Sequence, residues 1–272
     1  MKHVLVFVPT RLKGFDVTYF SILRQKLNGV KLIMCVADEY VQDRAEELAD
    51  KFERAGIEYV TFRMSKNPGY ERNLAASYKQ ALQFAREMDV DGVVSLQDYI
   101  YVPEDGIQKF VDVSEALDEK HLLTGICHIS ADPLPDKVVD PENNFTIFEH
   151  PYNGEPEEIH WEDVRKPNAE RHLSNGEHIT VTHPVEWEAN WAYIPKEALN
   201  DPELDYDEIF DRYVAYENQD YAYKAQELGY KIYLDTTNEV KSLPHKQYWA
   251  EVEKHEAPLT EYNRQIIMER YE

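Results

Sequence analysis

The sequence predicts an α/β protein whose mixed, mainly parallel sheet is flanked by helices and interrupted by an irregular insertion. Through about the first 96 residues, short apolar runs rich in β-branched residues alternate with segments of helical spacing. A long stretch rich in Pro, Asn, Asp and His follows, and regular patterns return after it. Such a stretch inside a compact protein is more often a functional insertion than a linker.

The first half predicts four strands and three helices in alternation. The strands are expected at residues 3–9, 30–37, 58–63 and 92–96, and the helices at 16–27, 42–55 and 71–88. The second helix ends at Gly56, which is a frequent helix stop. This β-α-β order is typical of a parallel, doubly wound sheet, whose ligands bind beyond the carboxyl ends of the strands.

The second half predicts fewer regular elements. Residues 128–185 form the insertion, and their recurring aromatic residues predict loops or a small hairpin packed on the sheet. After it we expect a strand within WEANWAYIP (187–195), a helix over 207–228, a strand over 230–235 and a helix in 257–272. We expect one domain over 1–272, with halves 1–110 and 111–256 before the last helix.

Composition limits the classes of partner and location. The 272 residues include 29 basic and 52 acidic side chains, a formal net charge of −23. Such a surface disfavours nucleic acid and anionic membranes unless a local basic groove exists, and it is also a common solubility trait. Cys35 and Cys127 lie in apolar runs, which favours buried thiols in a reducing compartment. With no run of about 18 apolar residues, we expect a soluble, cytoplasmic protein.

Several common enzyme motifs are missing, and polar residues gather at the predicted strand ends instead. The sequence has no GxGxxG, GxxxxGK[ST], CxxC, HExxH or GxSxG, which disfavours dinucleotide-binding and P-loop proteins, zinc proteases and α/β-hydrolases. The four strands are followed by Pro9-Thr10-Arg11, Asp38-Glu39, the segment 63–72 and Gln97-Asp98. Four polar strand ends at one edge predict a ligand cleft.

The order of these features resembles the nucleotide-sugar-dependent glycosyltransferases of the GT-A fold, particularly the large family 2. The resemblance rests on the segments VPT, VADE, SKNPGYERNLAASYKQAL, VVSLQDYIYVP, EANWAYIPKEAL, YENQDYAYKAQELGYKIYLD and SLPHKQYW, which span about residues 3–250. Each segment alone is weakly specific, whereas their order and spacing together are fairly specific. The resemblance implies a nucleotide-sugar donor bound in the half 1–110 and an acceptor site shaped by the insertion.

The donor contacts follow from this resemblance. The nucleoside is expected against Pro9, Thr10 and Arg11, and Asp38 is expected to accept hydrogen bonds from the base or the ribose. Arg72, Asn73 and Gln97 are expected near the ribose and the diphosphate. The structural alternatives are a helix N-cap for Asp38 and an ordinary helix start at Arg72 and Asn73.

A divalent cation, Mn²⁺ or Mg²⁺, is the expected cofactor, because it neutralises the charge that develops on the departing diphosphate. The family's Asp-x-Asp motif is reduced here to Asp98, and the resemblance implies His245 as the second ligand. Mn²⁺ accepts a mixed Asp and His set better than Mg²⁺ does. If metal binding is weak, the guanidinium of Arg72 could neutralise the diphosphate instead.

An inverting transferase needs a carboxylate that removes the proton of the acceptor hydroxyl. The family carries this base in a Glu-Asp pair, which reads Glu217-Asn218 here. Glu217 and Asp220 remain as candidates, with Asp220 preferred, and both also fit an acidic first turn favoured by the helix dipole. The loss of the usual Asp leaves a retaining mechanism open.

Residues on the acceptor side are less clearly marked. Trp187, Glu188 and Trp191 could stack on a sugar, although buried aromatic residues near a strand end are equally common. The acceptor is expected to be a glycan, a lipid-linked sugar or a protein rather than nucleic acid. A UDP-sugar-dependent glycosyltransferase is thus the leading hypothesis. Its alternatives are a nucleotidyltransferase, disfavoured by the single glycine in RLKGFD, and a sugar- or nucleotide-binding protein that lost its chemistry.

Overall fold

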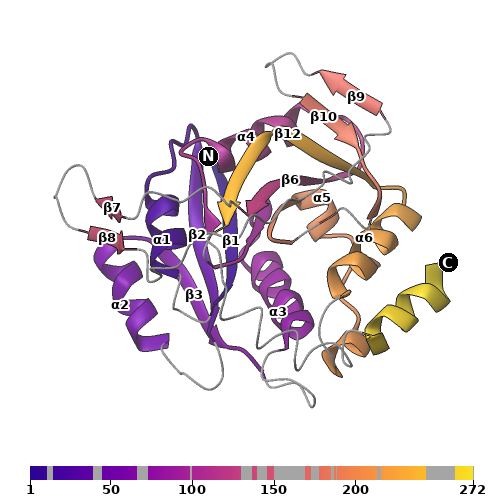
Figure 1. The fold of residues 1–272 in the computed structure, drawn as a ribbon, viewed down its shortest axis with the longest axis horizontal. Coiled ribbons are helices and arrows are strands. Elements are labelled where there is room, and N and C mark those ends of the chain that lie inside the picture. Colours follow the sequence, from indigo (N-terminus) through magenta and orange to yellow (C-terminus); the bar gives the residue numbers. More distant parts are fainter. Residues whose placement is uncertain are drawn as a thin grey trace, which may run out of the picture.

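The computed structural model describes most of the chain (Figure 1). The described residues are 1–10, 15–38, 45–65, 73–98, 100–129, 137–139, 146–149, 169–172, 178–184, 187, 189–212, 216–242 and 261–271.

The first half folds as the alternation predicts. Its elements are β1 (Lys2–Thr10), α1 (Phe15–Leu23), β2 (Val30–Asp38), α2 (Ala45–Ala55), β3 (Glu58–Arg63), α3 (Leu74–Glu87) and β4 (Gly92–Leu96). The strands lie side by side in the order β3-β2-β1-β4 and pair in parallel. Their carboxyl ends therefore meet at one edge of the sheet, which is where ligands of such sheets bind.

The second half continues the same sheet with a reversal. Its elements are β5 (Ile100–Tyr101), α4 (Gly106–Ala116), β6 (His121–Ile129), β11 (Trp191–Pro195), α5 (Lys196–Leu199), η2 (Glu208–Arg212), α6 (Glu217–Glu227) and β12 (Lys231–Ser242). Strand β11 lies antiparallel between β4 and β6, and β12 lies parallel to β6. Since β6 and β12 run in the direction of β4, the sheet is mixed and mainly parallel, which confirms the predicted fold class.

Three differences separate the predicted from the observed elements. The predicted helix over 207–228 is two helices, η2 and α6, and the strand expected at 230–235 extends to Ser242 as β12. Helix α4 and strand β6 were not among the predicted elements, although apolar residues at helical spacing in IQKFVDVSEA and the run HLLTGICHI would have indicated them.

The described parts of the insertion form two pairs of short strands. Strands β7 (Lys137–Val139) and β8 (Thr146–Glu149) make a separate antiparallel pair. Strands β9 (Ala169–His172) and β10 (His178–Val181) extend the main sheet, with β10 antiparallel to β12. The insertion thus contributes strands to the sheet, as well as the hairpin expected from its sequence.

Helices cover both faces of the sheet, because successive side chains of a strand point to opposite faces. On β1, Val4, Val6 and Val8 join a buried cluster with Phe15 of α1 and residues of α2 and α4. Leu5 and Phe7 join a second cluster with residues of α3, α5 and α6. The sheet is therefore sandwiched between two helical layers, as Figure 1 shows for the central strands.

A last helix covers residues 261–271, where the sequence predicts one. It lies beside α6 at the C-terminal end of the chain in Figure 1. Within the described residues, every helix is too short or too polar to span a bilayer.

The bulge in β12 holds a carboxyl group whose protonation we expect to affect stability. Pairing of β12 with β6 is irregular between Asp235 and Glu239. The Asp235 side chain is buried, and burial raises its pKa even though the backbone N–H and the hydroxyl of Thr237 donate to its Oδ1 at 2.9 and 2.8 Å. The folded state therefore holds the Asp235 proton more tightly than the unfolded chain does.

A raised carboxyl pKa means that stability is fully present below the unfolded pKa, about 3.9, and is lost as the pH rises through the higher folded value. We expect the stability of Asp235→Asn relative to the parent protein to increase across that pH window, because the amide cannot ionise. Urea unfolding of both proteins from pH 4 to 7 measures the difference. A difference that stays constant with pH would contradict the assignment.

Candidate functional site

The candidate site lies at the carboxyl ends of β1, β2 and β4. Thr10 of β1 pairs in register with Asp38 of β2, which in turn pairs with Arg63 of β3. The neighbouring strand β4 ends at Leu96 and is followed by Gln97 and Asp98. The polar strand ends expected from the sequence therefore lie along one edge.

A hydrogen bond joins two of these ends. The Thr10 hydroxyl donates to Asp98 Oδ2 at 3.0 Å, across 88 positions of sequence. Thr10 is fully buried, whereas Asp98 is only half-buried. Thr10 thus holds the carboxylate of Asp98 at this edge of the sheet, which we call the rim.

The predicted donor-side residues that the structure describes differ in exposure. Asp38 is fully buried, and residues 39–44, between it and Ala45 of α2, lie outside the described residues. Gln97 is half-buried like Asp98, so these two side chains are the better placed for direct contact with a ligand. Pro9 lies near the end of β1 and is also buried. Pro9 and Asp38 therefore pack beneath the half-buried side chains of the rim.

Asn73 adopts the structural role that the sequence left as its alternative. It is the N-cap of α3, and its Oδ1 accepts from the backbone N–H of Ala76 at 3.0 Å. Only 6% of the residue is exposed. Asn73 therefore fixes the position at which α3 begins.

The first turn of α6 forms the other side of the site. Glu217 opens this helix and is 3% exposed. Burial is the main cause that raises the pKa of Tyr78 on α3, and the charge of Glu217 adds to it, while Gln97 and Asn218 oppose it. The Tyr78 hydroxyl thus stays neutral, and both Glu217 at the start of α6 and Gln97 after β4 lie near it.

Asn218, at the position where the glycosyltransferase family that the sequence resembles has its base, accepts a hydrogen bond from a phenol. The Tyr206 hydroxyl donates to Asn218 Oδ1 at 3.0 Å. The Tyr206 ring stacks between Tyr78 and Tyr221, with ring centroids 5.0 and 4.7 Å away. Sequence reasoning missed Tyr78 and Tyr206. The available signal for Tyr78 was its position five residues after Asn73, within the segment SKNPGYERNLAASYKQAL that contributes to the family resemblance.

The structure corrects the assignment of Asp220 as the base. Its side chain is fully buried and lies against the last helix, where Arg270 Nη1 and the Tyr271 hydroxyl donate to its Oδ1 at 2.8 and 2.9 Å. Lys224 Nζ lies 2.9 Å from the other oxygen. The Asp220 carboxylate thus contacts two cations and a phenol within the protein, which favours Glu217 as the candidate base.

The structure also corrects the acceptor-stacking role of Trp187 and Trp191. Their exposed fractions are 1% and 0%. Trp187 stacks on Tyr221, and Trp191 contacts Phe110 with ring centroids 4.6 Å apart. Neither ring presents a face to a ligand, so the buried-aromatic alternative holds for both.

Four predicted site residues, Arg11, Arg72, Glu188 and His245, lie outside the described residues. Within the described part of the chain, no group of three or more His, Cys, Asp or Glu side chains could hold a metal ion. Asp98 is the half-buried carboxylate at the rim, and the described residues alone do not complete a metal site.

No protein-family model matches the chain, and no curated protein matches it. Solved structures of GT-A-type glycosyltransferases do match in fold. One is TarS 1–349 of S. aureus in complex with UDP-GlcNAc, with a TM-score of 0.53 and 11% identity over 90% of this chain. Another is the mannosyltransferase PcManGT of Pyrobaculum calidifontis in complex with GDP-Man and Mn²⁺, with a TM-score of 0.56 and 14% identity over 91% of this chain.

The match covers 59% of each of those two chains, so this chain spans about three fifths of their length. At such low identity the likeness establishes the fold. It agrees with the GT-A fold that the sequence predicts.

Proposed function

We propose that this protein is a glycosyltransferase that moves a sugar from a nucleoside diphosphate sugar, UDP-linked in our assignment, to a hydroxyl-bearing acceptor. The observation that carries the proposal is the Thr10–Asp98 contact at the carboxyl ends of β1 and β4 of a GT-A-type sheet, with Glu217 and Gln97 both near Tyr78. The solved structures with this fold include complexes with UDP-GlcNAc and with GDP-Man and Mn²⁺, which supports a nucleotide-sugar donor.

In the proposed reaction, the bond between the sugar C1 and the β-phosphate oxygen breaks, and its electron pair leaves with the nucleoside diphosphate. The acceptor oxygen forms the new bond to C1 from the opposite face, which inverts the configuration. Glu217 takes the proton of the acceptor hydroxyl. Gln97 donates hydrogen bonds to the diphosphate end of the donor, and Asp98, held by Thr10, would bind that end through a divalent cation.

A divalent cation would neutralise the charge on the departing diphosphate. We retain Asp98 and His245 as its expected ligands, although the described residues do not complete this set. Binding of Mn²⁺ to the parent protein and to His245→Ala, followed by calorimetry in the absence of donor, tests that expectation directly.

The general test is donor turnover. The protein is incubated with Mn²⁺ and a panel that includes UDP-GlcNAc and GDP-Man, and release of nucleoside diphosphate is followed with and without simple glycan acceptors. We expect slow hydrolysis of one UDP-sugar even without an acceptor. Tight nucleotide binding with no turnover of any donor would favour a binding protein, a reading to which the amide of Asn218 at the family's base position also points.

We expect Glu217→Gln to lower the rate of transfer by at least about 100-fold, because a glutamine cannot accept the acceptor proton. The amide keeps the shape of the side chain, so donor affinity should change little. Glu227→Gln, at the exposed far end of the same helix, is the matched control. Unchanged transfer in Glu217→Gln would rule out Glu217 as the base.

A further inference from the structure

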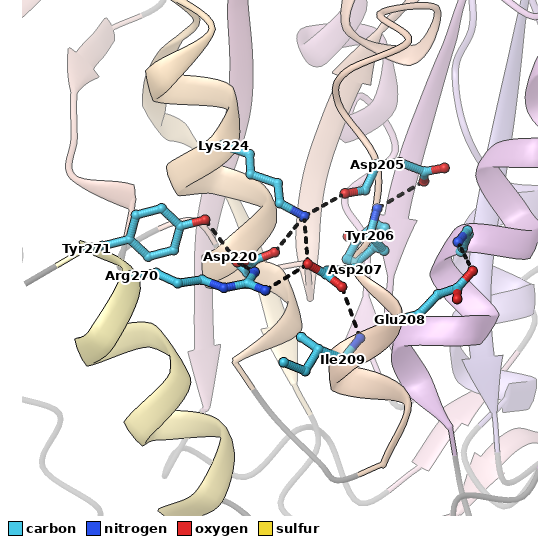
Figure 2. Close-up of polar contacts among 10 residues, drawn as sticks. Asp205, Tyr206, Asp207, Glu208, Ile209, Asp220, Lys224, Arg270 and Tyr271 are labelled. Atoms are coloured by element: carbon cyan, nitrogen blue, oxygen red, sulfur yellow. Dashed lines mark hydrogen bonds and ion pairs between the residues drawn. The ribbon is translucent and has the colours of Figure 1, made fainter.

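The first turn of α6 is fastened to the last helix by a group of five charged and phenolic side chains, which we name the Asp220 cluster (Figure 2). It consists of Asp207, Asp220, Lys224, Arg270 and Tyr271. Arg270 uses its two terminal nitrogens separately: Nη1 donates to Asp220 at 2.8 Å and Nη2 to Asp207 at 2.9 Å. Lys224 Nζ lies 2.9 Å from Asp220 and 3.6 Å from Asp207.

The charges of the cluster balance, with two carboxylates facing two cations. The pKa of Asp207 is lowered because the Ile209 N–H and Arg270 outweigh the opposing effect of partial burial. The pKa of Arg270 is raised by the two carboxylates, which outweigh burial. A planar guanidinium that bridges two carboxylates fixes their separation more tightly than a single ion pair does.

Apolar contacts seat the last helix on three elements at once. Ile267 is 4% exposed and clusters with Phe210 of η2 and Ala75 of α3. The Tyr271 ring stacks on Tyr223 of α6 with centroids 4.4 Å apart. Ala75 lies two residues after Asn73, the N-cap of α3, so this helix braces the starts of both helices that border the candidate site.

The start of α6 has no side-chain cap of its own. Its N-cap residue, Tyr216, has a left-handed backbone (φ 69°) and makes no side-chain cap hydrogen bond. A non-glycine residue adopts this conformation only where the surrounding structure holds it. Asp220 lies one turn after Glu217, and its N–H donates to the Tyr216 carbonyl at 3.0 Å.

From these contacts we propose that Arg270 and Tyr271 are positioning residues, which act through Asp220 to hold Glu217 and Asn218 in the site. The inference rests on the proposed transferase function. In it, the reaction depends on Arg270 and Tyr271 of the last helix, although neither side chain contacts the substrate. Loss of the Arg270 and Tyr271 contacts in the Asp220 cluster leaves the strand-end residues in place and lets the first turn of α6 shift. The donor should therefore still bind, while the reacting groups lose their alignment.

Arg270→Gln tests the proposal, with Arg264→Gln as the matched control. Arg264 is on the same helix and pairs with Glu261, three residues before it. We expect Arg270→Gln to lower kcat about 10- to 100-fold with a change of less than about two-fold in donor affinity, because misplacement by about 1 Å can cost that much. Arg270→Lys keeps the positive charge but loses the planar guanidinium that bridges the two carboxylates. Its kcat should therefore fall between those of Arg270→Gln and the parent protein.

A second readout keeps the inference separate from the proposed function. Hydrogen exchange of the amides in 217–221 should become at least about 10-fold faster in Arg270→Gln and stay unchanged in Arg264→Gln. If the parent protein turns over no donor, the transferase proposal fails. Hydrogen exchange still reports whether the Asp220 cluster holds the first turn of α6. Equal exchange in the two variants, or a loss of donor affinity equal to the loss of kcat, would overturn the positioning role.

Discussion

Asp98→Asn is expected to lower release of nucleoside diphosphate from the donor by at least about 100-fold, the usual range when a preorganised charge at the reacting group is removed. Asp98 is the half-buried carboxylate at the rim and receives the Thr10 hydroxyl at 3.0 Å. Asparagine keeps an oxygen that can accept this bond, so the fold should not change. Turnover of the donor with Mn²⁺ present measures the effect, and equal thermal melting of both proteins shows that folding is preserved.

Asp105→Asn provides the matched control for this experiment. Asp105 follows the same strand end, but its side chain is 57% exposed and pairs with Lys109 on the helix it precedes. Its replacement should leave turnover unchanged. If Asp98→Asn and Asp105→Asn release nucleotide at the same rate, the strand-end carboxylate has no part in the reaction.

Trp191→Ala is expected to reduce the free energy of unfolding by about 3–5 kcal/mol, as is typical when a fully buried large aromatic side chain is truncated. The ring lies on Gly125 of β6. A Cβ added at Gly125 would come within 2.2 Å of Trp191 Cδ1 and 2.4 Å of the Asn238 carbonyl oxygen. The strand thus leaves room for the ring by having no side chain at Gly125, and truncation to alanine would leave a cavity there.

Chemical denaturation of Trp191→Ala beside Tyr262→Ala separates burial from a ligand role. Tyr262 is an aromatic residue that is 39% exposed on the last helix, and its replacement should change stability by less than about 0.5 kcal/mol. A stable Trp191→Ala protein that has lost its response to acceptors would restore the stacking role that the structure argues against.

The fold was predictable from local patterns wherever a strand is buried on both faces. The runs that became β1, β2 and β4 are continuous and apolar, since helices cover both of their sides. The helix expected over 207–228 fails because Tyr216 adopts a left-handed backbone in its middle, and a tyrosine gives no local signal of that. The place of β11 between β4 and β6 depends on pairing across more than 60 residues, which no short pattern encodes.

The site was predictable as far as it consists of strand ends. Thr10 and Asp98 could be placed at one edge because parallel strands end together. The role of Asp220 could not, because an acidic first turn looks the same whether it faces a substrate or an arginine 50 residues later. The burial of Trp187 and Trp191 likewise depends on glycines and aromatic residues contributed by other elements.

The position of β11 has a consequence for how this protein can diversify. Strand β6 ends, and strand β11 begins, at the edge of the sheet where β4 ends, because β11 is antiparallel to both β4 and β6. The chain therefore leaves β6 at Ile129, adds β9 and β10 to the outer side of the sheet, and begins β11 at Trp191 close to Asp98, where the Gln97 N–H donates to the Asn190 carbonyl. Changes in the segment between β6 and β11 can therefore alter the surroundings of Asp98 while the pairing of β6 with β11 stays the same, as long as they preserve β10, which pairs with β12.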